Sequence, residues 1–357
     1  MTTISPSAER AVLDAVPTQL FIGGEWRDGT GGGTLPVEDP ATGETLVEVA
    51  DATVADGQAA LAAADEAFRT FRHVAPRDRG EILRRAYELM VERTEDLALL
   101  MTLEMGKALA ESRAEVAYAA SYFRWYAEEA VRINGRYQVA ENGLSRVLTM
   151  EQPVGPSFLI TPWNFPLAMG TRKVGPAIAA GCTSVVKPAK QTPLCMLAMA
   201  QILDEAGLPA GVCNVITGSR SGELMGPLIA DPRARKLSFT GSTQVGRKLV
   251  EQASEQLLRM SMELGGNAPF LVFPDADLEV AVDGAMLAKM RNIGEACTSA
   301  NRFLVHESVA TEFSERLADR MRGLVLGRGT DDAVTTGPLI DQAARDGVHR
   351  LVEDAVG

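Results

Sequence analysis

"GPSFLITPWNFPLAMGTRKVGPAIAAGCTSVVKPAK", from Gly155 to Lys190, decides the fold. Its segment PSFLI is a short apolar run typical of a strand, RKVGPAIAAG is helical in pattern, and TSVVK is a second strand. The alternation continues through PLCMLAMAQILDEAG, VCNVIT, GELMGPLIA, KLSF and QVGRKLVEQASEQ. Strands that alternate with helices predict an α/β fold, in which helices cover both faces of a parallel sheet.

The residues before this alternation predict a different organisation. FIGGEWRDG and PVEDPATGETLVEV are typical of short strands separated by turns. From Thr53 to about Ile133, apolar residues recur at three- and four-residue spacing, which predicts consecutive helices. Asn142-Gly143 lies between two alternating segments and predicts a hairpin at about 136–151.

Composition excludes several classes of protein. The 357 residues predict two domains, and a net charge of −12 argues against a nucleic-acid partner. No apolar run is long enough for a membrane helix, and the N-terminus lacks a signal-peptide pattern, so we expect a cytoplasmic protein. Irregularly spaced cysteines and only three histidines predict no disulfide framework and no metal site.

Polar residues follow the predicted strands, where ligands of parallel sheets bind. Asn164 lies between two prolines that stiffen its loop, although for this residue alone an ordinary turn asparagine is the simpler explanation. Lys187 and Lys190 follow the next strand, where they suit a phosphate or ribose or are simply surface charges. Gly241 and Gly246 have the outer spacing of G-x-G-x-x-G, but the middle position is threonine, so a phosphate site or an ordinary helix cap remains open.

Two further residues carry chemical groups of interest. Glu263 precedes a glycine pair and a new strand, and a carboxylate in a cleft is able to act as a base. Cys297 follows a predicted helix and lies in a loop of small and polar residues, as reactive groups often do. A free cysteine is more often a small buried residue, so Cys297 alone decides nothing.

Together, TPWNFP, KPAK, FTGSTQVG, MELGG and GEACTSANR resemble the aldehyde dehydrogenase superfamily over essentially the whole chain. The chain is most similar to the succinate-semialdehyde dehydrogenases of that superfamily. The resemblance implies a Rossmann-type cofactor domain at 1–258, interrupted by the hairpin, and the first part of a second α/β catalytic domain at 259–357. It also implies that the chain, which stops within a predicted helix, lacks the C-terminal part of that domain.

The resemblance further implies a role for each matching residue. Cys297 matches the nucleophile, Asn164 the side chain that holds the oxyanion, and Glu263 the general base. The positions that match cofactor contacts are Trp163, Lys187, Lys190, Gly241, Ser242, Gly246 and Leu264. Ser299 stands where some semialdehyde dehydrogenases carry a second cysteine, so no disulfide switch is expected there.

Substrate and cofactor are expected from the same comparison. Arg172 and Arg291 match positions that bind the distal carboxylate, so succinic semialdehyde is the expected substrate and glutaric semialdehyde the second choice. Lys190 stands where NAD-preferring members often have glutamate, which favours NADP over NAD. In its full-length form the protein is expected to be a homodimer or homotetramer.

Two alternatives stay open at this stage. One is a cysteine hydrolase or acyltransferase, which needs a base for the thiol, and His306 is the candidate. The other is an inactive binding or structural protein, because the resemblance implies residues that the chain does not contain.

Overall fold

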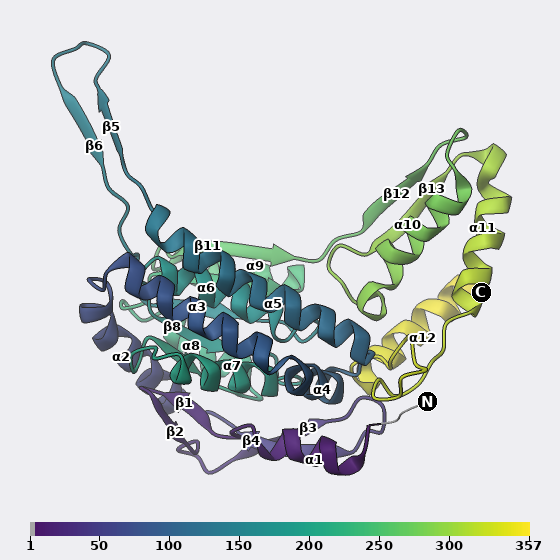
Figure 1. Ribbon diagram of the computed structural model, residues 1–357, viewed down its shortest axis with the longest axis horizontal. Coiled ribbons are helices and arrows are strands. Elements are labelled where there is room, and N and C mark those ends of the chain that lie inside the picture. The colour runs from purple at the N-terminus through teal and green to yellow at the C-terminus, as the bar shows by residue number, and fades with distance from the viewer. Residues whose placement is uncertain (1–3) are drawn as a thin grey trace.

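A seven-stranded sheet forms the centre of the computed structural model, which describes residues 4–357 (Figure 1). The strand order is β11-β10-β7-β8-β9-β1-β2. These strands are β1 Leu20–Ile22, β2 Glu25–Arg27, β7 Ser157–Ile160, β8 Ser184–Lys187, β9 Cys213–Val215, β10 Lys236–Gly241 and β11 Arg259–Leu264. The five strands from β7 to β11 are parallel, and β1 and β2 continue one edge in antiparallel pairing. The predicted parallel sheet is therefore confirmed.

Helices cover both faces of this sheet, as predicted. The first face carries α3 Pro76–Glu92, α4 Thr94–Met105, α5 Leu109–Glu129, α6 Ala168–Ala179 and α7 Leu194–Glu205. The second face carries α2 Val54–Phe71, α8 Ser221–Ile229 and α9 Thr243–Ser254. Successive side chains of a strand point to opposite faces, so Leu159 packs in the first core and Phe158 in the second. Both faces are buried, which explains why the strands are continuous apolar runs.

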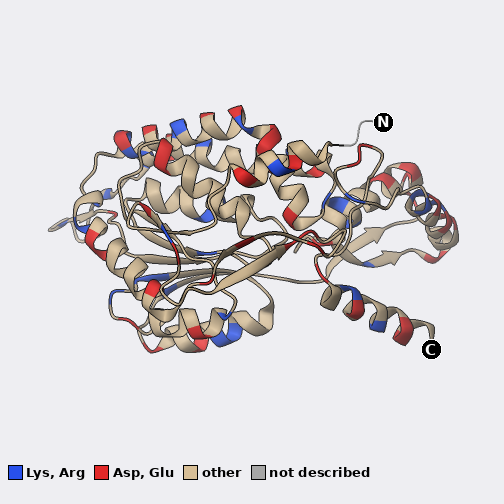
Figure 2. Ribbon diagram, turned by 90° about the horizontal axis from the view of Figure 1, so that it is seen from below, with Lys and Arg blue, Asp and Glu red and all other residues tan. Residues whose placement is uncertain are grey.

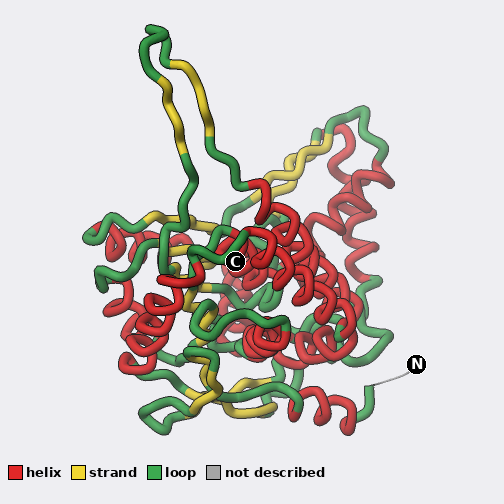
Figure 3. Tube along the Cα trace, turned by 60° about the vertical axis from the view of Figure 1, so that its left-hand side comes forward, coloured by secondary structure: helices red, strands yellow, loops and turns green. Residues whose placement is uncertain are grey.

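Two antiparallel pairs lie outside the large sheet. They are β3 Thr34–Glu38 with β4 Thr45–Ala50, and β5 Arg136–Val139 with β6 Arg146–Thr149. The second pair is the hairpin that Asn142-Gly143 predicts, and it projects from the body of the molecule (Figures 1 and 3). It exposes the apolar side chains of Tyr137, Leu144 and Leu148.

A smaller α/β unit follows the large sheet. It consists of β12 Ala268–Val272, α10 Leu278–Met290, β13 Ala300–Val305 and α11 Glu307–Arg322, around a core that includes Val282 and Phe313. Figure 1 shows this unit set apart from the sheet, beyond the end of β11. Because β11 pairs with β10, the large sheet extends past residue 258, and the domain boundary predicted there stays a prediction.

The remaining elements complete the surface. They are α1 Pro6–Asp14, α12 Gln342–Val356 and the 3₁₀ turns η1 Ala130–Arg132 and η2 Arg291–Gly294. Acidic and basic residues are interspersed along the outer helices (Figure 2). Within residues 4–357, no helix is both long and apolar enough to cross a membrane. The same residues contain no cluster of three or more His, Cys, Asp or Glu side chains that could hold a metal ion.

Candidate active site

A cavity of about 290 Å³ lies where the carboxyl ends of β7, β10 and β11 face the loop that precedes β13 in the smaller unit. Four chain segments line it: Pro162–Asn164, Thr240–Ser242, Glu263–Gly266 and Glu295–Cys297. The cavity therefore brings together Asn164, Glu263 and Cys297, three residues that are far apart in the sequence. Its position agrees with the rule that ligands of parallel sheets bind beyond the strand ends.

Cys297 is exposed, whereas the other three cysteines of the chain are buried. Burial raises the pKa of Cys213 to about 12 and that of Cys195 well above its ordinary value, so both remain protonated thiols. A thiol reacts as the thiolate and must be accessible. Cys297 is therefore the cysteine that a substrate can reach, and the alternative of a small buried residue is wrong for it.

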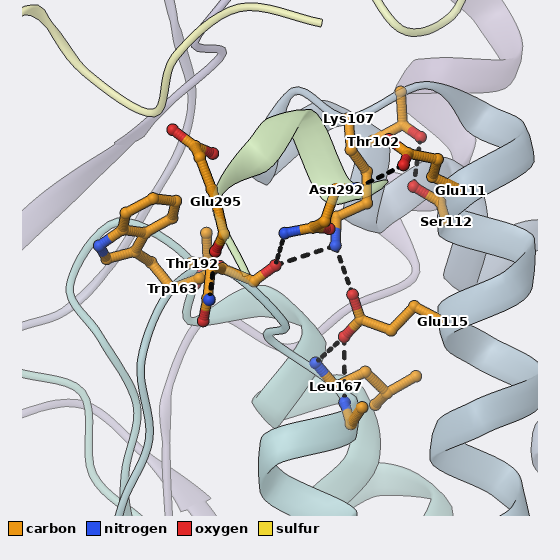
Figure 4. A network of polar contacts seen from close by, with 12 residues as sticks. Thr102, Lys107, Glu111, Ser112, Glu115, Trp163, Leu167, Thr192, Asn292 and Glu295 are labelled. Carbon is orange, nitrogen blue, oxygen red and sulfur yellow. Dashed lines mark hydrogen bonds and ion pairs between the residues drawn. The ribbon is translucent and has the colours of Figure 1, made fainter. Parts of the chain in front are cut away.

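Asn164 lies directly beside the Cys297 loop. Its side-chain Nδ2 donates a hydrogen bond to the Glu295 carbonyl oxygen at 2.6 Å. Its own carbonyl oxygen accepts from Lys107 Nζ and Asn292 Nδ2, each at 2.9 Å (Figure 4). An amide donor is thus held close to the backbone of the segment that carries Cys297.

Glu263 is half-exposed, and its carboxylate lies 3.5 Å from the guanidinium of Arg172 on α6. Arg291 lies elsewhere, with its guanidinium 5.5 Å from the centre of the Phe165 ring. The structure therefore places Arg172 beside the predicted base and Arg291 beside the Asn164 loop. No contact joins the two arginines in the described part of the chain.

Helix N-termini at this edge of the sheet differ in what occupies them. At α6, the Glu115 carboxylate accepts from the N–H groups of Leu167 and Ala168, both at 3.0 Å. At α7, Glu104 accepts from the first two N–H groups of the helix, at 2.7 and 2.9 Å. At α9, only the exposed Ser242 hydroxyl caps the helix. Helix N-termini bind anions, so α9 is the one of these three that is open to a phosphate group.

Five of the predicted cofactor residues line one of two cavities, whereas Lys187 and Gly246 line neither. Gly246 allows α9 to pack against β11, because a Cβ atom there would lie 2.7 Å from Leu264 Cδ2. Trp163, Gly241, Ser242 and Leu264 line the cavity that contains Cys297. Lys190 lines a second cavity, of about 370 Å³, next to Gln191 and Ser219.

The two lysines after β8 differ in environment. Lys187 is buried, and desolvation lowers its pKa to about 8, although the charge of Asp51 opposes this. The surface-charge alternative is therefore wrong for Lys187. Lys190 is exposed, and its positive charge is close enough to contribute to lowering the pKa of Lys187.

The sequence pattern did not indicate the buried ionisable groups of the Cys297 loop and of the first helical layer. Burial raises the pKa of Glu295 to about 7, and its Oε2 atom has no hydrogen-bond partner within residues 4–357. Glu104 and Lys107 were missed as well, although they interrupt the apolar run LALLMTLEMGKAL. Both side chains are fully buried, and isolated charges inside an apolar run are the signal that could have identified them.

Comparison with known proteins identifies the family. The profile described as "Aldehyde dehydrogenase family" matches residues 26–357. The chain belongs to the aldehyde dehydrogenase family. A succinate-semialdehyde dehydrogenase of Paenarthrobacter nicotinovorans is 60% identical over 311 residues, which cover 87% of this chain and 69% of that protein. A glutarate-semialdehyde dehydrogenase of Pseudomonas putida is 49% identical over 338 residues, which cover 95% of this chain and 70% of that protein.

Solved structures give the same result for the fold. A crystal structure described as an Escherichia coli NADP-dependent enzyme has a TM-score of 0.94 and 45% identity. The match covers 99% of this chain and 72% of that one. The predicted aldehyde dehydrogenase fold and enzyme class are therefore confirmed for this member of the family.

Proposed function

We propose that the protein oxidises a semialdehyde with a distal carboxylate, preferably succinic semialdehyde, with Cys297 as nucleophile and NADP as the favoured cofactor. The observation that carries the proposal is the shared cavity of Cys297, Asn164 and Glu263. A nucleophile, an oxyanion donor and a carboxylate base that line one cavity are the parts that acyl chemistry requires. The similarity to succinate- and glutarate-semialdehyde dehydrogenases supports the substrate class.

Each residue has a separate task in this proposal. The Cys297 thiolate attacks the aldehyde carbon, and the negative charge that develops on the aldehyde oxygen is stabilised by the Asn164 amide. Loss of a hydride from this adduct leaves a thioester on Cys297, and Glu263 accepts a proton from the water that then hydrolyses the thioester. Arg172 pairs with Glu263 at a partly exposed site, where an ion pair contributes little free energy. Glu263 is therefore able to leave Arg172 at small cost.

The cavity suits a dinucleotide. The open N-terminus of α9 offers the Ser242 hydroxyl and backbone N–H groups to a diphosphate, next to the cavity that contains Cys297. When bound, the dinucleotide supplies the hydride acceptor. Trp163 and Leu264 line the same cavity and are proposed to contact the cofactor. Lys187 and Lys190 are proposed to face its adenosine ribose.

The substrate assignment is tested by a panel of aldehydes, with NADPH formation followed at 340 nm. We expect kcat/KM for succinic semialdehyde to exceed that for its methyl ester, and glutaric semialdehyde to rank second. Arg291→Ala should reduce this discrimination by roughly 10- to 100-fold, because a charge-assisted hydrogen bond contributes about 1.5–3 kcal/mol. Arg172→Ala should do the same.

Arg69→Ala is the matched control, because Arg69 is an exposed arginine of α2 far from the site in the sequence. It should leave the discrimination unchanged. Equal kcat/KM for succinic semialdehyde and its methyl ester would show that no cation binds the distal carboxylate. The substrate assignment would then be wrong.

Lys190→Glu is expected to lower the ratio of kcat/KM with NADP to that with NAD by about tenfold. The physical reason is that a lysine attracts the 2′-phosphate of NADP, whereas a glutamate repels it and accepts from the 2′-hydroxyl of NAD. One charge-assisted contact of about 1.5 kcal/mol corresponds to roughly tenfold. Lys248→Glu, which makes the same charge change on an exposed face of α9, is the control. If both variants change the NADP-to-NAD ratio of kcat/KM equally, Lys190 does not bind the 2′-phosphate.

The alternative of a cysteine hydrolase finds less support. His306 caps α11 with its own Nδ1, which accepts from the backbone N–H of Ser308, and it is exposed. Among the described residues, no histidine lines the cavity that contains Cys297. Cofactor-independent hydrolysis of a thioester, without any aldehyde oxidation, would favour the hydrolase instead.

The oligomeric state of the protein and its location in the cell stay predictions. The exposed apolar side chains of the β5–β6 hairpin support the proposed homo-oligomer, because such a surface suits a partner. The cytoplasmic location rests on the sequence pattern alone.

A further inference from the structure

Lys107 lies between α4 and α5, and its side chain is completely buried. Its Nζ atom is 2.5 Å from the carboxylate of Glu115, whose side chain is also buried. It donates a second hydrogen bond to the Asn164 carbonyl oxygen (Figure 4). It also lies 4.6 Å from the centre of the Phe165 ring. A fully buried cation loses much hydration free energy, so its contacts within the protein must compensate for that loss.

The Lys107–Glu115 pair holds the Asn164 loop at two points, at Asn164 in its middle and at the end where α6 begins. Lys107 binds the carbonyl of Asn164 itself. Glu115 binds the first N–H groups of α6 through its other oxygen, at Leu167 and Ala168. The loop and the helix that follows it are therefore tied to one ion pair in the first helical layer.

The same carbonyl also fixes the turn before Cys297. Asn292 Nδ2 donates to the Asn164 carbonyl, and the Asn292 backbone N–H donates to Glu111 on α5 (Figure 4). Asn292 and Ile293 have φ angles of 57° and 62°. A β-branched residue at positive φ is strained, so surrounding contacts must hold this turn in place.

We infer that Lys107 is a positioning residue, which aligns the Asn164 amide with the Cys297 loop through the Asn164 carbonyl that it shares with Asn292. This inference rests on the function proposed above. It extends that function, because Lys107 lines no wall of the cavity that contains Cys297. Rate depends steeply on such alignment, since a displacement of about 1 Å costs roughly 100-fold.

The test is a double-mutant cycle on kcat. Lys107→Met, which keeps most of the length of the side chain but removes its charge, should lower kcat by about 30-fold, within the range for misalignment. In a background of Asn164→Ala, the same substitution should lower kcat by less than about threefold, because the amide that Lys107 aligns is then absent. If Lys107→Met lowers kcat by the same factor with and without Asn164→Ala, Lys107 does not act through Asn164. That result would overturn the inference.

Glu104→Gln provides the matched control. Glu104 is an equally buried carboxyl group of the same helical layer, and burial raises its pKa to about 7, but its hydrogen bonds cap α7 and do not involve Asn164. The control should leave kcat within about twofold of the wild type while changing the thermal midpoint, as a purely structural residue does. An equal loss of kcat in both variants would mean that Lys107 acts only through stability.

A second measurement tests the role of Lys107 without requiring enzyme activity. Hydrogen–deuterium exchange should increase in peptides covering residues 162–168 and 291–297 of Lys107→Met, and stay unchanged there in Glu104→Gln. If the wild-type chain oxidises no aldehyde, the proposed function fails, but these exchange data still decide the inference. Unchanged exchange in both segments would overturn it.

A second variant covers the case in which Lys107→Met does not fold. Lys107→Met leaves the Glu115 carboxylate buried without its cation, which is strongly destabilising. If that variant does not fold, Lys107→Met combined with Glu115→Gln takes its place, because a glutamine oxygen can still accept from the N–H groups of α6. The cycle and the exchange measurement are then repeated with this pair, and the same outcomes support or overturn the inference.

Discussion

Replacing Cys297 with serine is expected to lower kcat for aldehyde oxidation by at least about 10³-fold, because loss of an enzyme nucleophile typically removes most of the catalysed rate. A serine hydroxyl has nearly the same shape but is a far weaker nucleophile at neutral pH. Cys297 is also exposed in the cavity that contains Asn164 and Glu263. The measurement is NADPH formation at 340 nm under saturating succinic semialdehyde.

The buried cysteines serve as matched controls. Cys182→Ser, Cys195→Ser and Cys213→Ser should retain the chemistry, because all three side chains are buried. Alkylation with iodoacetamide, followed by mass spectrometry, should modify Cys297 first and in step with the loss of activity. Stoichiometric alkylation of a different cysteine that tracks inactivation would remove Cys297 from its proposed role.

Replacing Asn164 with alanine is expected to lower kcat by roughly 10²- to 10³-fold, the usual effect of losing one oxyanion donor. The reason is the position of its Nδ2 atom, 2.6 Å from the Glu295 carbonyl and therefore beside the Cys297 loop. Asn164→Asp should be as slow as Asn164→Ala, because a carboxylate of the same shape offers no amide donor. Both rates are compared with the wild type at saturating substrate.

Two results separate an oxyanion role from a structural one. The rate at which iodoacetamide alkylates Cys297 should stay within about threefold of the wild type in both variants, because alkylation at a saturated carbon develops no oxyanion. NADP affinity should also be retained. A folded Asn164→Ala variant with kcat within threefold of the wild type would show that another group stabilises the oxyanion.

Local patterns predicted most of the fold. The apolar run PSFLI became β7, and Asn142-Gly143 became the tip of the β5–β6 hairpin. Asp277, which directly precedes the apolar residues of α10 in the sequence, caps that helix. These predictions succeeded because strand burial, turn chemistry and helix capping depend on residues that are close in sequence.

The burial and surroundings of individual charged side chains were less predictable than secondary structure. The sequence alone left Lys187 open as a surface charge, but it is buried at the end of β8. Glu295 was not expected in the site, although it lines the cavity that contains Cys297. Burial of a charge depends on what packs over it, and the covering segments are distant in the chain.

The sequence by itself determined the parallel sheet and the edge of it at which the polar loops gather, because both follow from the order and period of local segments. Only the tertiary structure decided which groups meet there. The hydrogen bonds that hold the Asn164 carbonyl join residues 57 and 128 positions apart, and those that close the N-termini of α6 and α7 span 52 to 91 positions. Long-range pairs of this kind leave no periodic pattern, because they form only after the helices have packed on the sheet.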